Sequence, residues 1–295
     1  MKKFHMERWP NFFIVGADKA GTSSLYAYLN EIPGIFMSRY KEPNYFSSKT
    51  FGDNHHLRPF RDKKKYLDLF KNVKDEKIVG EASPSYLADQ DAPKLIHEVS
   101  PEAKILISLR DPVERVYSHY LMLNRLGEIK SHFDKLLQIS LDDNRNKNED
   151  PLWLDRGLYY ENVTRYISIF GKEQVKIIIF EDFVKDPQST IKEILNFLNL
   201  KYELNNIKTD VFNKYGLVRG PLAQKILRNR TVRRVSERLL SPSKRRFLKE
   251  HFLLKEVLKP EIEEKDRKLL VNYYIQDVQK IEQLLGRELS WKNFL

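Results

Sequence analysis

Short apolar runs alternate along the chain with longer segments in which apolar residues recur at helical spacing. Continuous runs of aromatic and β-branched residues are typical of strands that are buried on both faces of a parallel sheet. Apolar positions that repeat every three or four residues indicate helices with one buried face. The pattern therefore predicts strands at 11–16, 34–37, 77–81, 104–109 and 175–180, and helices near 22–30, 63–72, 91–99, 112–126, 159–170 and 187–199.

Strands and helices in this alternation predict an α/β fold in which a mostly parallel central sheet is covered by helices on both faces. Residues 47–62 and 140–157 are predicted to be loops, and a last helix spans about 261–286 with Gly286 as its C-cap. With 295 residues, 41% of them apolar, the chain is long enough for one large domain.

The composition narrows the class of protein. Because the chain has no cysteine, it can form neither a disulfide nor a thiolate metal site, and its 7 histidines show no metal-ligand spacing. No apolar run reaches the roughly 18 residues of a membrane span, and the N-terminal MKKFHMERWP lacks the apolar region of a signal peptide. We therefore expect a cytoplasmic protein that requires no metal.

The first candidate site lies where the first predicted strand turns into a helix. The strand FFIV is followed by a turn that Gly16 and Gly21 bracket and that contains Lys19. The helix then opens with three hydroxyl residues, Thr22, Ser23 and Ser24. Unpaired N–H groups and the positive end of the helix dipole stabilise an anion at such a position. The segment is therefore a candidate phosphate-binding turn.

The turn differs from the loop of nucleotide triphosphatases, which reads G-x-x-x-x-G-K-[ST] and works with a magnesium ion. Thr22 stands where that loop has its lysine, and the lysine of this chain, Lys19, lies inside the turn. The change moves the ammonium toward the bond that breaks, and it argues against an ATPase or a GTPase. An ordinary strand-to-helix turn with a surface lysine is the alternative interpretation.

The second candidate site follows the strand KILISL, which ends in Arg110, Asp111 and Pro112. Asp111 suits the cap of the next helix and Pro112 its first position. Arg110 stands at the carboxyl end of the strand, where α/β sheets bind ligands, and Arg115 and Ser118 share one helix face. A guanidinium and a hydroxyl suit a phosphate dianion. The alternative is an Arg110–Asp111 ion pair that only caps the helix.

These two turns, in this order, resemble those of sulfotransferases that use 3′-phosphoadenosine 5′-phosphosulfate (PAPS). The first, K-x-G-T-[ST] after a strand, resembles the 5′-phosphosulfate loop, and the second resembles the 3′-phosphate site. Other segments resemble the family's K-E-P, G-E-x-[ST]-P-x-Y, R-G-x-Y and F-E-D-x-x-x-D-P patterns, at 41–46, 80–86, 156–159 and 180–187 respectively. The resemblance covers roughly residues 11–200, and more loosely the rest.

The resemblance implies a single P-loop-like sulfotransferase domain over 1–295, with a donor-binding core at about 11–200 and a basic helical region at about 216–295. It implies in-line sulfuryl transfer from PAPS to an acceptor hydroxyl or amine, without a metal, leaving 3′-phosphoadenosine 5′-phosphate (PAP). Glu42 would be the base, and Lys19 would stabilise charge on the bridging oxygen of the leaving group. The implied donor-binding residues are Lys19, Ala20, Gly21, Thr22, Ser23, Ser24, Arg110, Ser118, Tyr159, Arg219 and Gly220.

Glu42 and its neighbours are the predicted acceptor side. A carboxylate is a suitable base if burial raises its pKa or if the proton moves late, whereas an adjacent lysine opposes this. An exposed acid paired with Lys41 is the alternative for Glu42. Members that act on heparan-type glycans commonly have a lysine in place of Ala82 and often a histidine in place of Asn44, so a sulfated glycosaminoglycan is disfavoured. A carbohydrate or other hydroxylated metabolite is expected, contacted by Lys41, Asn44, His55 and His56.

The basic stretch from Arg219 to Lys249 contains one acid, Glu237, and contributes much of the net charge of +11. It can be a solvated helical face, or it can contact an anionic membrane surface or an acidic acceptor. Nucleic acid is not expected, because the motifs of such modules are missing. Two rival functions are a magnesium-dependent nucleotide kinase and a non-catalytic anion- or membrane-binding module, in which Lys19 would be dispensable. The acceptor, O- or N-sulfation and the oligomeric state stay open.

Overall fold

The structure is a computed structural model that describes residues 8–47, 59–142, 150–201, 216–229 and 249–295, with scattered positions between 232 and 248. The contacts divide the chain into two compact units, each of which is described by itself. The first unit draws on residues 1–110 and 159–210, and the second on residues 111–158 and 211–295. His55 and His56 lie outside the described residues.

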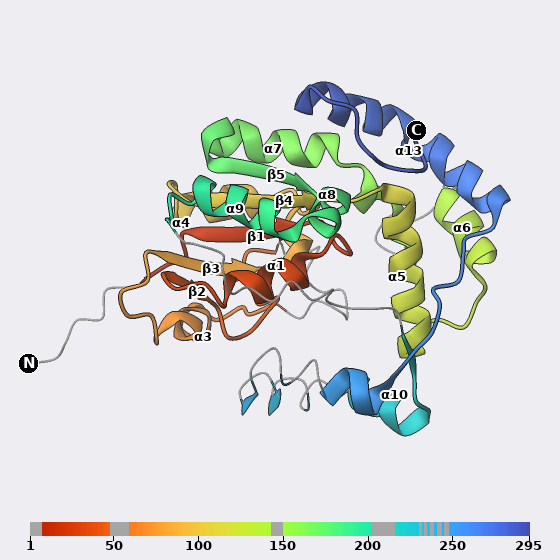
Figure 1. Ribbon diagram of the computed structural model, residues 1–295, viewed down its shortest axis with the longest axis horizontal. Coiled ribbons are helices and arrows are strands. Elements are labelled where there is room, and N and C mark those ends of the chain that lie inside the picture. Colours follow the sequence, from red (N-terminus) through yellow and green to blue (C-terminus); the bar gives the residue numbers. More distant parts are fainter. Residues whose placement is uncertain are drawn as a thin grey trace, which may run out of the picture. The chain divides into compact units, whose positions relative to one another are not determined.

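The first unit is built on a five-stranded sheet in the order β2-β3-β1-β4-β5, and all its neighbouring strands are parallel. Every residue of β1 and β3 is buried, so the centre of the sheet is covered on both faces (Figure 1). This confirms the expected α/β fold with a parallel sheet. The strands are β1 (Phe12–Gly16), β2 (Ile35–Met37), β3 (Ile78–Ala82), β4 (Lys104–Leu109) and β5 (Val175–Ile179).

Helices follow most of these strands. Helix α1 packs against β1, β2 and β3, whereas α7, α8 and α9 pack against β5. The predicted helix at 63–72 is a short α-helix that continues as a 3₁₀ turn at 68–70. The α-helices of this unit are α1 (Thr22–Leu29), α3 (Lys63–Leu67), α4 (Ala92–Val99), α7 (Tyr160–Phe170), α8 (Phe180–Lys185) and α9 (Pro187–Phe197).

The second unit is mainly helical. The strands β6 (Gly216–Val218) and β7 (Leu254–Glu256) pair antiparallel. Gly286 caps α13 in the left-handed conformation, as predicted. The prediction of a loop over 140–157 is wrong at both ends, because α6 reaches Leu141 and a 3₁₀ turn forms at Leu154–Gly157. The α-helices of this unit include α5 (Pro112–Leu126), α6 (Phe133–Leu141), α10 (Pro221–Arg228) and α13 (Glu264–Leu285).

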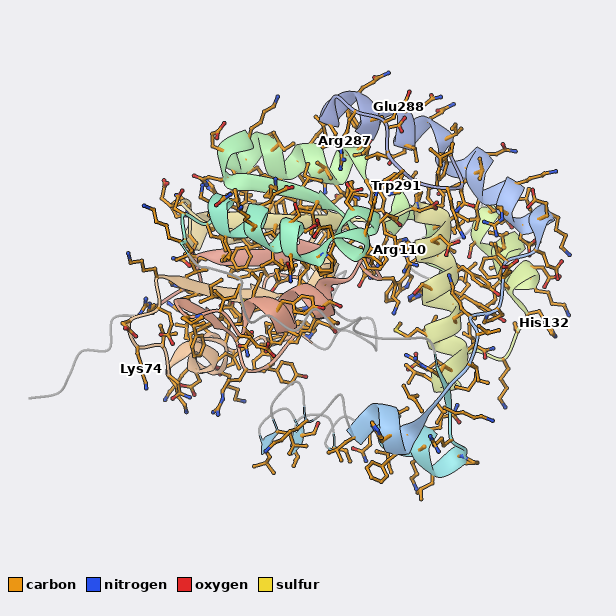
Figure 2. All side chains as sticks on the ribbon, in the orientation of Figure 1. Lys74, Arg110, His132, Arg287, Glu288 and Trp291 are labelled. Carbon is orange, nitrogen blue, oxygen red and sulfur yellow. The ribbon has the colours of Figure 1, made fainter. Side chains whose placement is uncertain are left out.

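The core of the second unit forms around α13. The ring of Tyr274 is buried, and its hydroxyl donates to the carbonyl oxygen of Leu154 at 2.8 Å. Gly157 lies so close that a Cβ there would be 2.9 Å from this ring. Trp291, beyond the end of α13, is also fully buried (Figure 2). Among the helices that the structure describes, none is both long and apolar enough to cross a bilayer.

Candidate active site

The turn between β1 and α1 requires glycine at position 21. Gly21 caps α1 with φ +80°, and the N–H groups of Ser24 and Leu25 donate to its carbonyl oxygen. A Cβ at Gly21 would lie 2.7 Å from the ring of Phe180. A side chain is therefore excluded both by the backbone conformation and by the space. The amides of Thr22 and Ser23, the first two of α1, stand at the positive end of the helix, as a phosphate-binding turn requires.

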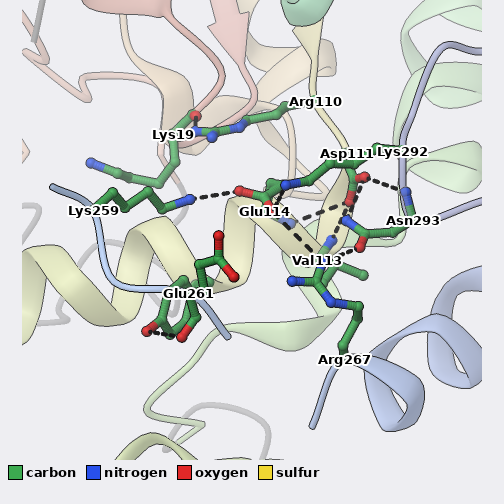
Figure 3. A network of polar contacts seen from close by, with 11 residues as sticks. Lys19, Arg110, Asp111, Val113, Glu114, Lys259, Glu261, Arg267, Lys292 and Asn293 are labelled. Carbon is green, nitrogen blue, oxygen red and sulfur yellow. Dashed lines mark hydrogen bonds and ion pairs between the residues drawn. The ribbon is translucent and has the colours of Figure 1, made fainter. Parts of the chain in front are cut away.

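The end of β4 contacts the same turn. The hydroxyl of Ser108 donates to the carbonyl oxygen of Ala20 at 2.6 Å. Arg110 donates through Nη1 to the carbonyl oxygen of Lys19 at 2.9 Å (Figure 3), and its guanidinium lies 4.7 Å from the centre of the Phe180 ring. The two turns predicted from separate motifs thus contact each other at the carboxyl edge of the sheet, through the Arg110 side chain and the Lys19 backbone.

Two further predicted donor residues have different surroundings. Tyr159 is fully buried, and its hydroxyl donates to the carbonyl oxygen of Arg110 at 2.8 Å. Tyr159 therefore supports the backbone that carries Arg110. Among the hydroxyl residues that open α1, Thr22 and Ser24 are buried, whereas Ser23 is exposed.

Glu42 lies in a loop of residues 41–47, here called the Glu42 loop. Its N–H donates to the carbonyl oxygen of Ala82, the last residue of β3, at 2.9 Å. The Lys41 ammonium lies 2.5 Å from the Glu42 carboxylate, and the two side chains are 12% and 34% exposed. The Lys41–Glu42 ion pair weighed as the alternative is thus present, and the carboxylate remains partly accessible.

Asn44 is only 1% exposed. Its side-chain amide donates to the carbonyl oxygen of Glu42 at 3.1 Å, and the Ser85 hydroxyl donates to its Oδ1 at 2.7 Å. These contacts connect the Glu42 loop to the segment after β3. A contact from Asn44 to the acceptor stays a prediction.

Sequence reasoning assigned no role to Glu81, the residue of β3 just before Ala82. Its carboxylate is fully buried and accepts hydrogen bonds from three hydroxyls, those of Tyr66, Ser83 and Tyr86. Burial raises the pKa of Glu81 to about 7, against the opposite effect of these three donors. Glu81, Ser83 and Tyr86 are the Glu, Ser and Tyr of the G-E-x-[ST]-P-x-Y segment, so this motif could have indicated the cluster.

The remaining predicted donor residues belong to the second unit. Ser118 is partly exposed on α5, and Arg115 on the same helix is buried and donates to the carbonyl oxygen of Trp153 at 2.7 Å. Arg219 is exposed, and its Nε donates to the carbonyl oxygen of Leu254 at 2.7 Å. Gly220 caps α10 with φ +103°. Roles of Ser118, Arg219 and Gly220 in binding the donor stay predictions.

The start of α5 is held by charged groups (Figure 3). Asp111 accepts from the N–H groups of Val113 and Glu114 through one oxygen, which confirms the predicted cap, and from Asn293 through the other. The Glu114 carboxylate pairs with Lys259 at 2.6 Å and with Lys292 at 3.1 Å. Burial raises the pKa of Glu114, but the hydrogen bonds and charges of these lysines outweigh that effect and lower it to about 2.

The fold and the first turn define a class of protein. A parallel sheet whose first strand leads through a glycine turn into a helix, with basic side chains at its carboxyl edge, is the P-loop-like arrangement of phosphate-binding α/β proteins. The family described as "Sulfotransferase domain" matches residues 10–216. The chain therefore belongs to the sulfotransferase family.

Similar proteins agree with this membership. The chain is 30% identical over 253 residues to carbohydrate sulfotransferase 15 of Rattus norvegicus, covering 68% of the chain and 45% of that relative. It is 27% identical over 197 residues to heparan sulfate glucosamine 3-O-sulfotransferase 6 of Mus musculus, covering 66% and 53%. It thus spans about half the length of these curated relatives. The crystal structure of a sulfotransferase from Alicyclobacillus acidocaldarius matches with a TM-score of 0.72 and 30% identity, covering 97% of this chain and 99% of that one.

Proposed function

We propose that the protein transfers the sulfuryl group of PAPS to a hydroxyl group of a carbohydrate or another hydroxylated metabolite, or to an amine. The observation that carries this proposal is the contact between Arg110 and the carbonyl oxygen of Lys19 at the carboxyl edge of the sheet. It joins the Arg110 guanidinium to the backbone of the turn that contains Lys19, in a chain of the sulfotransferase family. The names of the carbohydrate sulfotransferase relatives support a sugar as the acceptor.

The residues around the turn fit the anionic groups of the donor. The α1 amides and Lys19 would hold the 5′-phosphosulfate, because the amides stand at the positive end of the helix, directly after the turn that contains Lys19. Arg110 would hold the 3′-phosphate, with its guanidinium oriented by the Phe180 ring and the Lys19 carbonyl. Tyr159 would support this side through the Arg110 backbone. Roles of Ser118, Arg219 and Gly220 in binding the donor also remain part of the proposal.

The reaction would proceed in line. The acceptor oxygen or nitrogen attacks sulfur, the bond from sulfur to the 5′-phosphate oxygen breaks, and the acceptor proton passes to the Glu42 carboxylate. Lys19 stabilises the negative charge that develops on the leaving oxygen. Glu42 is 34% exposed, so an acceptor can reach it, and its pairing with Lys41 must open or shift as the proton arrives.

The acceptor would differ from a highly sulfated glycan. Ala82 is fully buried at the end of β3, at the position of the lysine that heparan-type members commonly carry, and it supplies no positive charge there. Lys41 directly precedes Glu42 in the sequence, and its ammonium pairs with the Glu42 carboxylate. We therefore propose a neutral sugar or hydroxylated metabolite, held through Lys41, Asn44, His55 and His56. A cytoplasmic location also remains part of this proposal.

Calorimetric titration with PAP in the absence of magnesium tests the donor site. The parent should bind PAP tightly and ADP poorly, and Arg110→Ala should abolish PAP binding. Lys19→Ala should lower the affinity, whereas Arg39→Ala and Lys71→Ala, which remove exposed cations, should not. A protein that binds ATP better than PAP, and only with magnesium, would instead be a nucleotide kinase. Full PAP affinity in Lys19→Ala would favour a non-catalytic anion-binding module.

A further inference from the structure

Glu81 is a buried carboxylate that takes no direct part in the proposed proton and sulfuryl transfer. It is fully buried in β3, an interior strand of the sheet, where an unpaired carboxylate would be strongly unfavourable. Hydrogen bonds from three hydroxyls replace those that the carboxylate would form with water. Tyr66 donates to Oε1 at 2.7 Å, Tyr86 donates to Oε1 at 3.0 Å, and Ser83 donates to Oε2 at 2.6 Å.

Two of these hydroxyls also bind the backbone of the Glu42 loop. The N–H of Asn44 donates to Ser83 Oγ at 3.1 Å, and the N–H of Phe46 donates to the Tyr86 hydroxyl at 3.2 Å. Tyr66 contacts the loop through its ring, which stacks on Tyr45, and none of the hydrogen bonds among the described residues joins its hydroxyl to a loop amide. The carboxylate is therefore linked to the loop through Ser83 and Tyr86.

The chemistry of the carboxylate sets the direction of these hydrogen bonds. A hydroxyl has one proton to donate, and the Glu81 carboxylate, once it is ionised above about pH 7, can only accept. Ser83 and Tyr86 must therefore direct their protons to Glu81, which leaves their lone pairs for the amides of Asn44 and Phe46. A glutamine at this position would donate as well as accept, so one of the two chains of hydrogen bonds would reverse.

The loop depends on such support, because its backbone is strained. Glu42 has φ +64° and Asn44 has φ +51°, in the left-handed region that residues other than glycine rarely adopt. Conformations of this kind persist only where the surrounding contacts determine them. Here the contacts include the bond from Glu42 N–H to the Ala82 carbonyl and the two bonds to Ser83 and Tyr86, besides those of the Asn44 side chain.

We propose that Glu81 is a positioning residue for the transfer reaction: by orienting the hydroxyls of Ser83 and Tyr86, it holds the Glu42 loop in the conformation that presents Glu42 to the acceptor. This inference rests on the proposed function for the role of Glu42 as the base. Its structural half, the control of the loop by Glu81, can be measured without any acceptor.

Hydrogen–deuterium exchange of the Asn44 and Phe46 amides is the first measurement, on the full chain and on three variants. Glu81→Gln should speed exchange at least tenfold at one or both of these amides, and Tyr86→Phe should do so at Phe46. Tyr66→Phe is the matched control, because it removes an equivalent buried hydroxyl from Glu81 but no bond to a loop amide. Thermal unfolding of each variant shows whether a general loss of stability accounts for the change.

Sulfuryl transfer is the second measurement, with PAPS as donor and a panel of mono- and oligosaccharides and phenols as acceptors. Glu81→Gln should lower kcat at least tenfold and leave the KM for PAPS and the PAP affinity unchanged, whereas Tyr66→Phe should keep the parent kcat. A merely structural role would lower PAP-binding capacity and activity together in both variants. Unchanged amide exchange in Glu81→Gln overturns the inference, even if no acceptor in the panel is sulfated. Faster exchange with an unchanged kcat overturns it too.

The failure of the proposed function gives a different result. If Glu42→Gln keeps the parent kcat, the assignment of the base is wrong, whatever the exchange measurement shows. If PAP binds but Glu81→Gln leaves the loop amides protected, the donor site stands and only the positioning role of Glu81 is lost.

Discussion

Burial of Glu81 predicts that the protein loses stability as the pH rises through neutrality. Its pKa is raised from 4.5 to about 7 in the folded protein. Folding therefore favours the protonated group, and this contribution is fully present below pH 4.5 and lost as the pH rises through 7. A difference of this size amounts to about 3 kcal/mol over the whole range, and to about 2.5 kcal/mol between about pH 5 and pH 8.

Comparison with Glu81→Gln isolates this contribution, because glutamine does not titrate. The free energy of unfolding should be measured by urea denaturation at several pH values for both proteins. The parent should lose about 2 to 3 kcal/mol relative to the variant between about pH 5 and pH 8. For Glu31→Gln, the same change at an exposed carboxylate, the free energy of unfolding should vary with pH in parallel with that of the parent. A constant difference between parent and Glu81→Gln would refute the reasoning, since it would mean that Glu81 has similar pKa values in the folded and unfolded chain.

Three further predictions concern other parts of the fold. Gly21→Ala should destabilise the protein by about 1 to 3 kcal/mol and abolish PAP binding, because its Cβ would lie 2.7 Å from the Phe180 ring on a backbone with φ +80°. Urea denaturation measures the first effect and calorimetric titration the second, and an unchanged affinity for PAP would contradict the prediction. Gly157→Ala should lower the free energy of unfolding by a similar amount, because its Cβ would lie 2.9 Å from the Tyr274 ring. The kcat of the molecules that remain folded should not change. Glu114, with a folded pKa lowered to about 2, should stabilise the protein above pH 4.5 and lose this effect as the pH falls through 2, so the advantage of the parent over Glu114→Gln should vanish during acid denaturation.

The strands were predictable because strands buried on both faces read as continuous apolar runs. β4, for example, has the predicted bounds of 104–109. Helices α6 and α8 were missed. Helix α8 is six residues long and buries only Phe183, so it has too few turns to show a period. Helix α6 runs into a stretch rich in aspartate and asparagine, a composition typical of loops, and buries Phe133, Leu136 and Leu137 over barely more than two turns.

The donor side of the candidate site was more predictable than the acceptor side. Lys19 and Arg110 each follow a strand, and because β1 and β4 are neighbours in the sheet, their ends meet. The support of the Glu42 loop joins residues about 40 positions apart, such as Phe46 and Tyr86, and no local pattern indicates such a contact. Pairing of Lys41 with Glu42 was considered as the alternative to a free base because the two residues are adjacent in the chain, and the pair is present.

The two sides of the candidate site are held in different ways, and this bears on how the acceptor could change. Arg110 binds the turn directly through a backbone carbonyl, which any residue at position 19 would supply. The Glu42 loop, in contrast, is held through side-chain hydroxyls and through Asn44, whose amide bonds both Glu42 and Ser85. A histidine at position 44, as in some heparan-type members, cannot form this pair of bonds in the same geometry. A change of acceptor through Asn44 would therefore also require new support for the Glu42 loop, whereas the donor site could stay as it is.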